Sequence, residues 1–435
     1  MQFGFAFLEA GSVRAKNTTN ILIKNILDLY VGALCYWMFG YAFAFGKPGN
    51  GFIGAGYFFF SNIPGESLST FFFHWVFAAT ATTIVSGAVA ERTEFISYLF
   101  YSVGLTGIIY PIVSHWAWSD EGWLANGPNV SYRDFAGSGV VHMVGGTAAL
   151  VGAAILGPRI GRFDENGKPQ IIQGHTVPLV ALGGFILLFG FFAFNGGSQA
   201  SVSQPGDAFI ISNAVVNTIL SGASAALVSL SVSRTGFGSG KWSLLTTING
   251  GLAGMVAICA GCDAEFAWGA VVTGILAGFV YHLTTQLVEY ARVDDPLDAV
   301  AVHLGGGVVG VLTAPFLIYP EGIVFNWDGP SFLIFGWNIV GGITIFLWTA
   351  ALSTLLFGGL QLTGFLRVSE EIELKGLDIP KHGEPAYPPI SYHVGWQSDL
   401  YNLPPDDSPG AKGVGKFIFS SYTYTLCQAS SHSRY

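Results

Sequence analysis

The amino-acid sequence predicts an all-α protein that crosses a membrane many times. Hydrophobic residues make up 51% of its 435 positions and charged residues only 10%, whereas charged residues are about 25% of an ordinary soluble domain. The charged residues lie between long apolar runs, and one motif within those runs occurs twice. The composition excludes an ordinary soluble protein, and in this setting the net charge of −9 does not indicate a nucleic-acid partner.

A helix needs about 20 apolar residues to cross a bilayer, and ten runs of roughly this length are present. The apolar stretch 1–12 precedes them and is about half as long, so we expect it to be the end of an eleventh helix that is truncated. The ten runs lie at 20–45, 71–90, 95–115, 138–156, 176–195, 208–233, 243–261, 266–288, 299–318 and 331–366.

The motif DFAGSGVVHMVGG at 134–146 has a second copy, DPLDAVAVHLGGG, at 295–307. In each copy an Asp stands eight residues before a His, and a glycine pair follows the His by three and four residues. The ending FAFLEAGS of the first helix similarly resembles FFAFNGGS at 191–198. With five spans in each unit, the units must enter the membrane from opposite sides. This predicts an inverted repeat with its site near the membrane midplane.

The predicted transmembrane domain covers 1–366. It consists of a first repeat at about 1–157, a second repeat at about 174–318 and a long final helix at about 331–366. The segment 367–435 is polar and rich in proline, so we expect a cytoplasmic and largely irregular tail.

Basic residues are concentrated in alternate connections between the runs, nine in one set and two, Lys47 and Arg133, in the other. Short cytoplasmic loops carry an excess of Lys and Arg. We therefore expect the N-terminus outside the cell, the C-terminal tail in the cytoplasm, and the plasma membrane as the location.

His142 and His303 place two ionisable side chains inside apolar runs. Such groups are costly in a membrane and usually functional, although two unrelated core histidines are the alternative. Burial in apolar surroundings favours the neutral imidazole, which has one donor and one acceptor nitrogen. Two such rings in contact would suit the passage of a small polar molecule or a proton, and not of a hydrated metal ion.

Aromatic side chains are dense around the histidine motif, among them Phe73, Phe77, Trp118 and Phe194. Aromatic faces bind cations with about 0.5 to 2 kcal/mol. A Trp and a Phe with the hydroxyl of Ser198 would form an outer vestibule that selects a small cation. Helix packing or an interfacial position is the alternative for each ring taken singly.

Three aspartates accompany the histidines. Asp134 and Asp295 begin their helices, and eight residues span about 12 Å along a helix, so neither reaches its own His. Helix capping is therefore at least as well supported as a role in transport. Asp298, five residues before His303, is expected to help hold the inner end of the tenth span.

Asn129 begins an Asn-Val-Ser sequon in a predicted outer connection and is a candidate glycosylation site. Cys259 and Cys262 form a CxxC pair at the end of an apolar run with no second pair near it, which argues against a metal or redox site. We expect neither a metal nor another cofactor.

Seven runs together are similar to the ammonium transporter family (Amt/Mep, distantly Rhesus), and more closely to its eukaryotic and plant-like Amt branch. They follow one another in order over residues 1 to about 390. The runs are LEAGSVRAKN, FAATATTIVSGAVAER, YPIVSHWAWSDEGW, DFAGSGVVHMVGG, FAFNGGS, RVDDPLDAVAVHLGGGVVG and LRVSEEIELKGLDIPKHGEPAY.

The resemblance implies a membrane transporter rather than an enzyme, with an eleven-helix fold and a homotrimer in which each subunit has its own pore. The implied substrate is ammonium or ammonia, with methylammonium as a candidate analogue. An electroneutral NH3 or CO2 channel of the Rhesus type and an ammonium sensor are the alternatives. A membrane metalloenzyme is weaker, because no HExxH motif or third convergent ligand accompanies the histidines.

The resemblance also implies roles for single residues. His142 and His303 match the paired pore histidines, and Asp134 matches an acidic residue at the head of the fifth helix. The start at Met1 departs from a full first helix, and Pro380 stands where plant relatives carry a regulatory threonine, which rules out phosphorylation there. The implied recruitment site is Trp118, Phe77 and Ser198, and the implied gate is Phe77, Phe194 and Phe73.

Overall fold

The computed structural model of the chain describes residues 1–235 and 240–388. Within these ranges the regular secondary structure is helical, with only isolated β-bridges besides, so the predicted all-α class is confirmed. Residues 1–386 form one compact unit. The last part of the expected tail, 389–435, lies outside the described residues.

The first half of the bundle begins with the short helix α1 and contains several helices that continue through a π-helical turn. A π-helix closes its hydrogen bonds over one more residue than an α-helix and is usually a single wide turn. The elements are α1 (Gln2–Ser12), η1 (Ala15–Asn17), α2 (Thr18–Cys35), η2 (Tyr36–Gly40), α3 (Tyr41–Phe45), η3 (Phe58–Phe60), α4 (Ser67–Ala88), α5 (Phe95–Gly104), η4 (Leu105–Ile109), α6 (Tyr110–Trp118), η5 (Ser138–Met143) and α7 (Val144–Leu156).

The second half repeats this order and is followed by the long helix α13. Polar residues begin several of its helices: Ser243 accepts the amide of Thr246 at the start of α10, and Asp328 accepts the amide of Ser331 at the start of α13. The elements are α8 (Val177–Gly197), α9 (Asp207–Arg234), α10 (Leu244–Ile258), α11 (Ala267–Tyr290), η6 (Val300–Gly305), α12 (Gly306–Leu317), α13 (Gly329–Leu362), α14 (Glu370–Lys375) and η7 (Asp378–His382).

In the described part of the chain, nine continuous helical segments are long and apolar enough to cross a bilayer. The predicted span 243–261 is present as the shorter helix α10, which has 15 residues, and α1 is a half-length helix of 11 residues. Each predicted span coincides with a helix to within a few residues. The chain is a multi-pass membrane protein.

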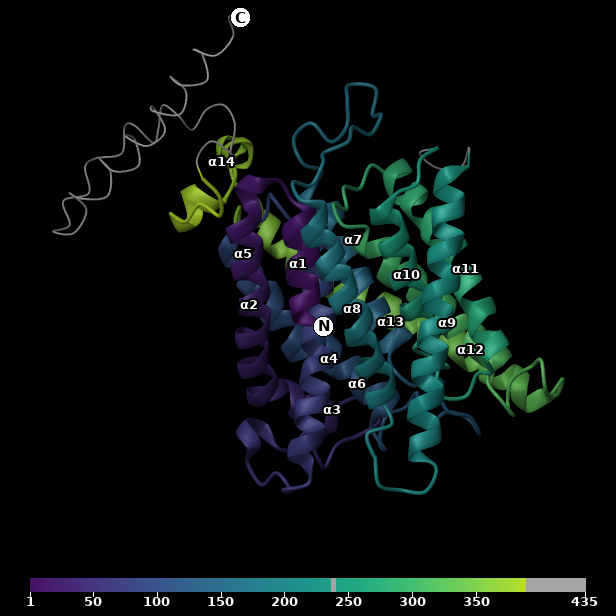
Figure 1. Ribbon diagram of the computed structural model, residues 1–435. Coiled ribbons are helices and arrows are strands. Elements are labelled where there is room, and N and C mark those ends of the chain that lie inside the picture. Colours follow the sequence, from purple (N-terminus) through teal and green to yellow (C-terminus); the bar gives the residue numbers. More distant parts are fainter. Residues whose placement is uncertain (236–239, 389–435) are drawn as a thin grey trace, which may run out of the picture. The chain divides into compact units, whose positions relative to one another are not determined.

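The two halves run in opposite directions through the bundle. Helix α1 lies beside α8, with Gly4 against Leu187 and Gly11 against Val180, so the numbering rises along one helix as it falls along the other. The histidine segments cross in the same way, because Gly146 meets Leu304. Figure 1 shows α1 next to α8, with the N-terminus near the middle of the bundle. The predicted inverted repeat is confirmed.

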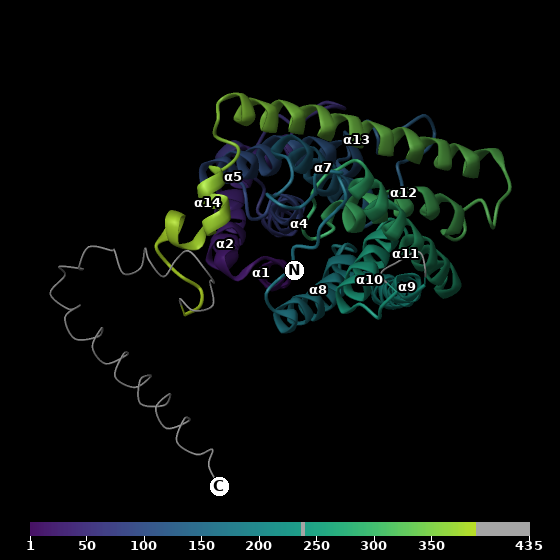
Figure 2. The same ribbon diagram turned by 90° about the horizontal axis from the view of Figure 1, so that it is seen from above.

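Helix α13 lies along one side of both halves. It packs against α7 of the first half and α12 of the second, and in the view from above it runs past both (Figure 2). It therefore holds the two histidine-bearing segments together from outside.

One end of the bundle carries a buried network of charged groups, and we call this end the basic face. Glu91 binds the guanidinium groups of Arg14 and Arg159 at 3.1 and 2.9 Å, and Arg159 also binds Asp294 at 2.7 Å. These residues come from four connections that are far apart in sequence. The network therefore ties both repeats together at this end.

The first part of the expected tail also packs on the basic face. Arg367 pairs with Glu373 at 2.9 Å, Glu373 accepts the amide of Ile160, and Lys381 pairs with Glu94 at 2.7 Å. The polar composition had indicated an irregular tail from residue 367, but 367–386 belongs to the compact unit. Its charged side chains find partners on the bundle, which composition alone does not reveal.

Candidate functional site

Two histidines from opposite halves meet at the centre of the bundle. The Nδ1 atoms of His142 in η5 and His303 in η6 are 3.1 Å apart, and the rings are nearly parallel, with centroids 5.2 Å apart. Both side chains are buried, at 0% and 5% exposure. At this distance one Nδ1 donates a hydrogen to the other, so each ring presents its Nε2 away from the pair.

Each histidine lies in a six-residue π-helical turn that precedes an ordinary α-helix. The glycine pair that follows each His makes the same two contacts in both halves. A Cβ on Gly145 or Gly306 would lie 2.8 Å from a carbonyl oxygen of α4 or α10, and a Cβ on Gly146 or Gly307 would enter the opposite histidine segment. Glycine is required here because backbones approach one another closely. The repeated motif thus encodes the crossing that brings the rings together.

The carboxylate of Asp134 caps the turn that carries His142. Its Oδ1 accepts the amides of Gly137 and Ser138 at 3.0 and 2.7 Å, and its Oδ2 accepts those of Gly139 and Val140, both at 2.9 Å. A negative charge at a helix N-terminus is favourable. The geometry of Asp134 is therefore that of a capping residue that fixes the position of His142.

The two aspartates of the second copy hold the other histidine segment. Asp295 accepts the amide of Val300 at 2.7 Å, which repeats the capping arrangement with fewer donors. Asp298 accepts a hydrogen bond from Tyr281 at 2.7 Å and from Asn249 at 3.2 Å. It links η6 to α11 and α10.

An aromatic wall lies on the side of the histidine pair away from the basic face. Phe77 of α4 and Phe194 of α8 stack with centroids 4.0 Å apart, and Phe73 and Trp118 contact Phe77 at 4.5 and 5.9 Å. Phe194 in turn lies 5.5 Å from the ring of His142. The stacked pair therefore separates Trp118 from the histidines.

The remaining predicted site residues lie around this wall. The indole of Trp118 donates to the carbonyl oxygen of Asp134 at 2.8 Å, which joins the wall to the cap of the histidine turn. Ser198 ends α8 one turn beyond Phe194 and donates its hydroxyl to the Phe194 carbonyl at 2.8 Å. Asn129 is exposed in the connection before η5.

No pattern in the sequence predicted the polar groups on the other side of the histidines. Phe5 of α1 contacts His303 with ring centroids 5.9 Å apart, and Glu9 follows one turn later. Both line a small cavity together with His303 and Asn249. The space for the centre of a water molecule in it is about 20 Å³, which is room for about one water. The LEAGS motif contains Glu9, but only the antiparallel packing of α1 brings it near the histidines.

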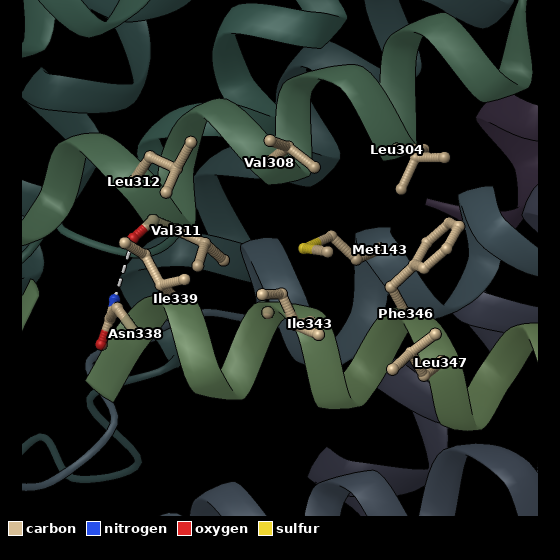
Figure 3. A pocket seen from close by; sticks show the side chains of 11 residues that line it. Met143, Leu304, Val308, Val311, Leu312, Asn338, Ile339, Ile343, Phe346 and Leu347 are labelled. Atoms are coloured by element: carbon tan, nitrogen blue, oxygen red, sulfur yellow. Dashed lines mark hydrogen bonds between the residues drawn. The ribbon is translucent and has the colours of Figure 1, made fainter. Parts of the chain in front are cut away.

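A larger apolar pocket lies behind the pair and is not part of the same path. It offers about 360 Å³ between η5, η6, α12 and α13, and its lining is almost wholly apolar. Met143 and Leu304, which follow the two histidines, point into it (Figure 3), and neither histidine lines it. Asn338 is its one polar lining residue and already donates to the carbonyl oxygen of Val311, so this pocket offers little to replace the water around an ion.

The described ranges 1–235 and 240–388 contain no group of three or more His, Cys, Asp or Glu side chains that could hold a metal ion. Cys259 and Cys262 are buried free thiols in the turn after α10. The Cys259 thiol lies 3.1 Å from the Asn195 side-chain oxygen, and both cysteines pack in the hydrophobic core.

Comparisons with known proteins agree over almost the whole chain. The sequence profile described as Ammonium Transporter Family matches residues 1–387. A Caenorhabditis elegans protein is 47% identical over 418 residues, which cover 91% of this chain and 78% of that protein. The Oryza sativa protein Ammonium transporter 1 member 1 is 41% identical over 95% of this chain and 85% of its own length. The solved structure of a Sensor Amt Protein superposes with a TM-score of 0.81 at 35% identity, covering 88% of this chain and 94% of that one.

Proposed function

The chain belongs to the ammonium transporter family and is an ammonium transporter; from this premise we propose how its pore works. NH4+ binds at the outer aromatic wall, loses a proton, and crosses as NH3 past the stacked phenylalanines and the two histidines. The proton follows through the imidazole pair. The observation that carries this proposal is the contact of 3.1 Å between the Nδ1 atoms of two buried histidines.

Recruitment uses the face of Trp118 and the oxygen of Ser198. The Ser198 hydroxyl already donates to the Phe194 carbonyl, so its oxygen lone pairs remain to accept a hydrogen from NH4+. Phe77, which contacts Trp118, adds a second aromatic face. K+ is similar in size but donates no hydrogen bond, so the serine contact favours NH4+.

The energetics explain why the cation gives up its proton. Burying an unpaired ion costs several kcal/mol even after relaxation, and a desolvated cation–π contact returns only about 2 kcal/mol. Between the wall and His142 the cation would meet the stacked rings of Phe77 and Phe194, of which Phe194 lies 5.5 Å from the ring of His142. Neutral NH3 avoids this penalty, whereas K+ has no neutral form and is rejected.

The histidine pair suits both the neutral molecule and the proton. The Nε2 of His142 is buried and has no hydrogen-bond partner, so it can accept a hydrogen when His142 donates through Nδ1 to His303. A proton added at His142 Nε2 then moves the Nδ1 hydrogen onto His303. His303 releases its own Nε2 hydrogen on the inner side.

The test is to replace His142 with Asp. A carboxylate in the water-free part of the pore would stabilise an ion that keeps its charge. We therefore expect K+ currents in proteoliposomes, whereas the unmodified protein should give none. Ser114→Ala, which alters a buried hydroxyl outside this path, is the matched control. If His142→Asp still excludes K+ completely while conducting ammonium, a dehydrated pore that requires deprotonation is contradicted.

Two alternatives give different results in the same vesicles. An electroneutral NH3 or CO2 channel would change internal pH without any current. Ammonium sensing is a second candidate because of the similarity to the Sensor Amt Protein. It would persist as tail-dependent signalling in a histidine variant that no longer transports.

We further propose a homotrimer in the plasma membrane, with the basic face in the cytoplasm and the N-terminal end of the half-length helix α1 directed toward the outside. The positive residues on that face support the orientation. Every residue of the proposed pore comes from one chain, which supports an independent pore in each subunit. Asn129 then lies outside the cell, where its sequon is accessible for glycosylation.

A further inference from the structure

We propose that Glu9 accepts the proton released by His303 and passes it toward the basic face through a buried set of ionisable side chains. We call Glu9, Lys24 and Asp28 the inner proton group. This inference rests on the proposed function, because it names the route of the proton that accompanies NH3.

The position of Glu9 follows from α1. Phe5 touches the ring of His303 at 5.9 Å, and four residues advance a helix by about 6 Å toward the basic face. Glu9 and His303 line the same cavity, which has room for about one water. A single water can therefore connect the inner nitrogen of His303 to the Glu9 carboxyl.

The surroundings of Glu9 accommodate both of its protonation states. The side chain is 2% exposed, and its oxygens accept from Asn25 Nδ2 at 2.7 Å and from Ser86 Oγ at 2.5 Å. The Ser86 hydroxyl is also 2.7 Å from the carbonyl oxygen of Thr83. When Glu9 is ionised, Ser86 donates to it. When Glu9 is protonated, Ser86 turns to Thr83 and accepts the new hydrogen.

The charges of the inner proton group leave a place for one proton. Glu9 of α1 and Asp28 of α2 are two carboxyls, and Lys24 of α2 is an ammonium; all three are buried. A net charge in such surroundings is costly. With both carboxyls ionised the set carries one negative charge, and one added proton makes it neutral.

The group also reaches the basic face. Tyr98 donates to Asp28 at 2.5 Å, and Lys24 donates to the carbonyl oxygen of Thr93 at 3.2 Å. The next residue, Glu94, pairs with Lys381, and both of these side chains are 22% exposed. Buried polar side chains thus lie between Glu9 and an ion pair that is in contact with solvent.

The proposed step balances as a proton relay. The Nε2–H bond of His303 breaks and its electron pair stays on nitrogen, while the bridging water gains that hydrogen and gives another to a Glu9 oxygen. His303 is an imidazolium after it accepts the hydrogen at Nδ1 from His142, and loss of the Nε2 hydrogen returns it to a neutral ring. No oxidant or other reactant is needed.

The experiment compares the unmodified protein with Glu9→Gln in proteoliposomes, measuring both current and internal pH after an ammonium pulse. We expect the current to fall at least tenfold while entry of ammonia still raises the internal pH. Glu9→Asp, which keeps a carboxyl, should recover part of the current. Glu265→Gln changes an equally buried carboxyl near the opposite face and should retain the current.

Each outcome decides the proposal. A Glu9→Gln current within twofold of the unmodified protein overturns it, and so does a folded variant that loses current and ammonia entry together. If Glu9→Gln does not give monodisperse protein, Asp28→Asn is measured in its place with the same expectations. If the unmodified protein takes up no ammonium at all, the proposed function itself is refuted. This result differs from a failure of the Glu9 proposal, because it appears without any substitution.

Discussion

Replacing Asp134 with Asn tests whether the four-donor cap holds the histidine turn. The carboxylate accepts two backbone amides on each oxygen, and all four lie within 3.0 Å. Asn has only one side-chain oxygen, so two amides would face its NH2 group. Each buried donor left unsatisfied costs about 1 to 3 kcal/mol. Removing a buried charge offsets part of this loss, and we expect a net destabilisation of about 2 to 4 kcal/mol.

Thermal unfolding of the purified protein in detergent measures this effect, with Asp295→Asn as the matched control. Asp295 accepts the amide of Val300 on Oδ2, and its Oδ1 has no partner, so the side-chain oxygen of Asn can accept that amide in its place. We expect that control to lose less than about 1 kcal/mol. Equal losses in the two variants would refute the argument that the number of satisfied amides fixes the position of His142.

Two further predictions concern stability. Burial alone would raise the pKa of Glu91, but the guanidinium groups of Arg14 and Arg159 outweigh it and lower the pKa from 4.5 to about 2. Because the folded pKa is the lower one, the stabilisation is complete above about pH 4.5 and is lost as the pH falls toward 2. The stabilisation amounts to a few kcal/mol at about 1.4 kcal/mol per pKa unit. The melting temperature of Glu91→Gln should therefore depend less on pH in this window than that of the unmodified protein. An unchanged pH dependence would contradict the stabilising role of ionised Glu91. For Gly183→Ala, the new Cβ would lie 2.2 Å from a backbone nitrogen of α1, and overpacking of this kind costs about 1 to 3 kcal/mol. In the control variant Gly197→Ala, the new Cβ has no atom within 4 Å, and the melting temperature should be no lower than that of the unmodified protein. Equal melting temperatures of the two alanine variants would count against close packing of α1 on α8.

The sequence predicted the bundle well because lipid imposes a simple rule on the backbone. Every segment inside a bilayer must satisfy its own hydrogen bonds, so an apolar run of sufficient length is a helix. The spans were therefore identified to within a few residues. Their opposite directions followed from counting five spans in each repeat.

The contact between the histidines could also be predicted from the sequence, because His142 and His303 occupy equivalent positions of an inverted repeat. The basic-face network and the position of Glu9 beside His303 could not be predicted. Arg159 and Asp294 are far apart in sequence and pair only after folding. Glu9 is one acidic residue in a short apolar helix, and its distance from His303 depends on how α1 packs. Neither relation follows a period or spacing along the chain.

The π-helical turns of η5 and η6 restrict how the length of this chain can change. Deleting one residue from the turn before the glycine pair would convert the wide turn to an α-helical one, which rotates by about 100° per residue instead of by the smaller step of a π-helix. The residues inside the turn, His142 among them, would then point in different directions, and the contact between the two Nδ1 atoms would be lost. Apolar replacements in this stretch should be tolerated, whereas insertions and deletions should be missing from both copies in working relatives. The number of residues between the aspartate and the glycines is thus as strict a requirement as their identity.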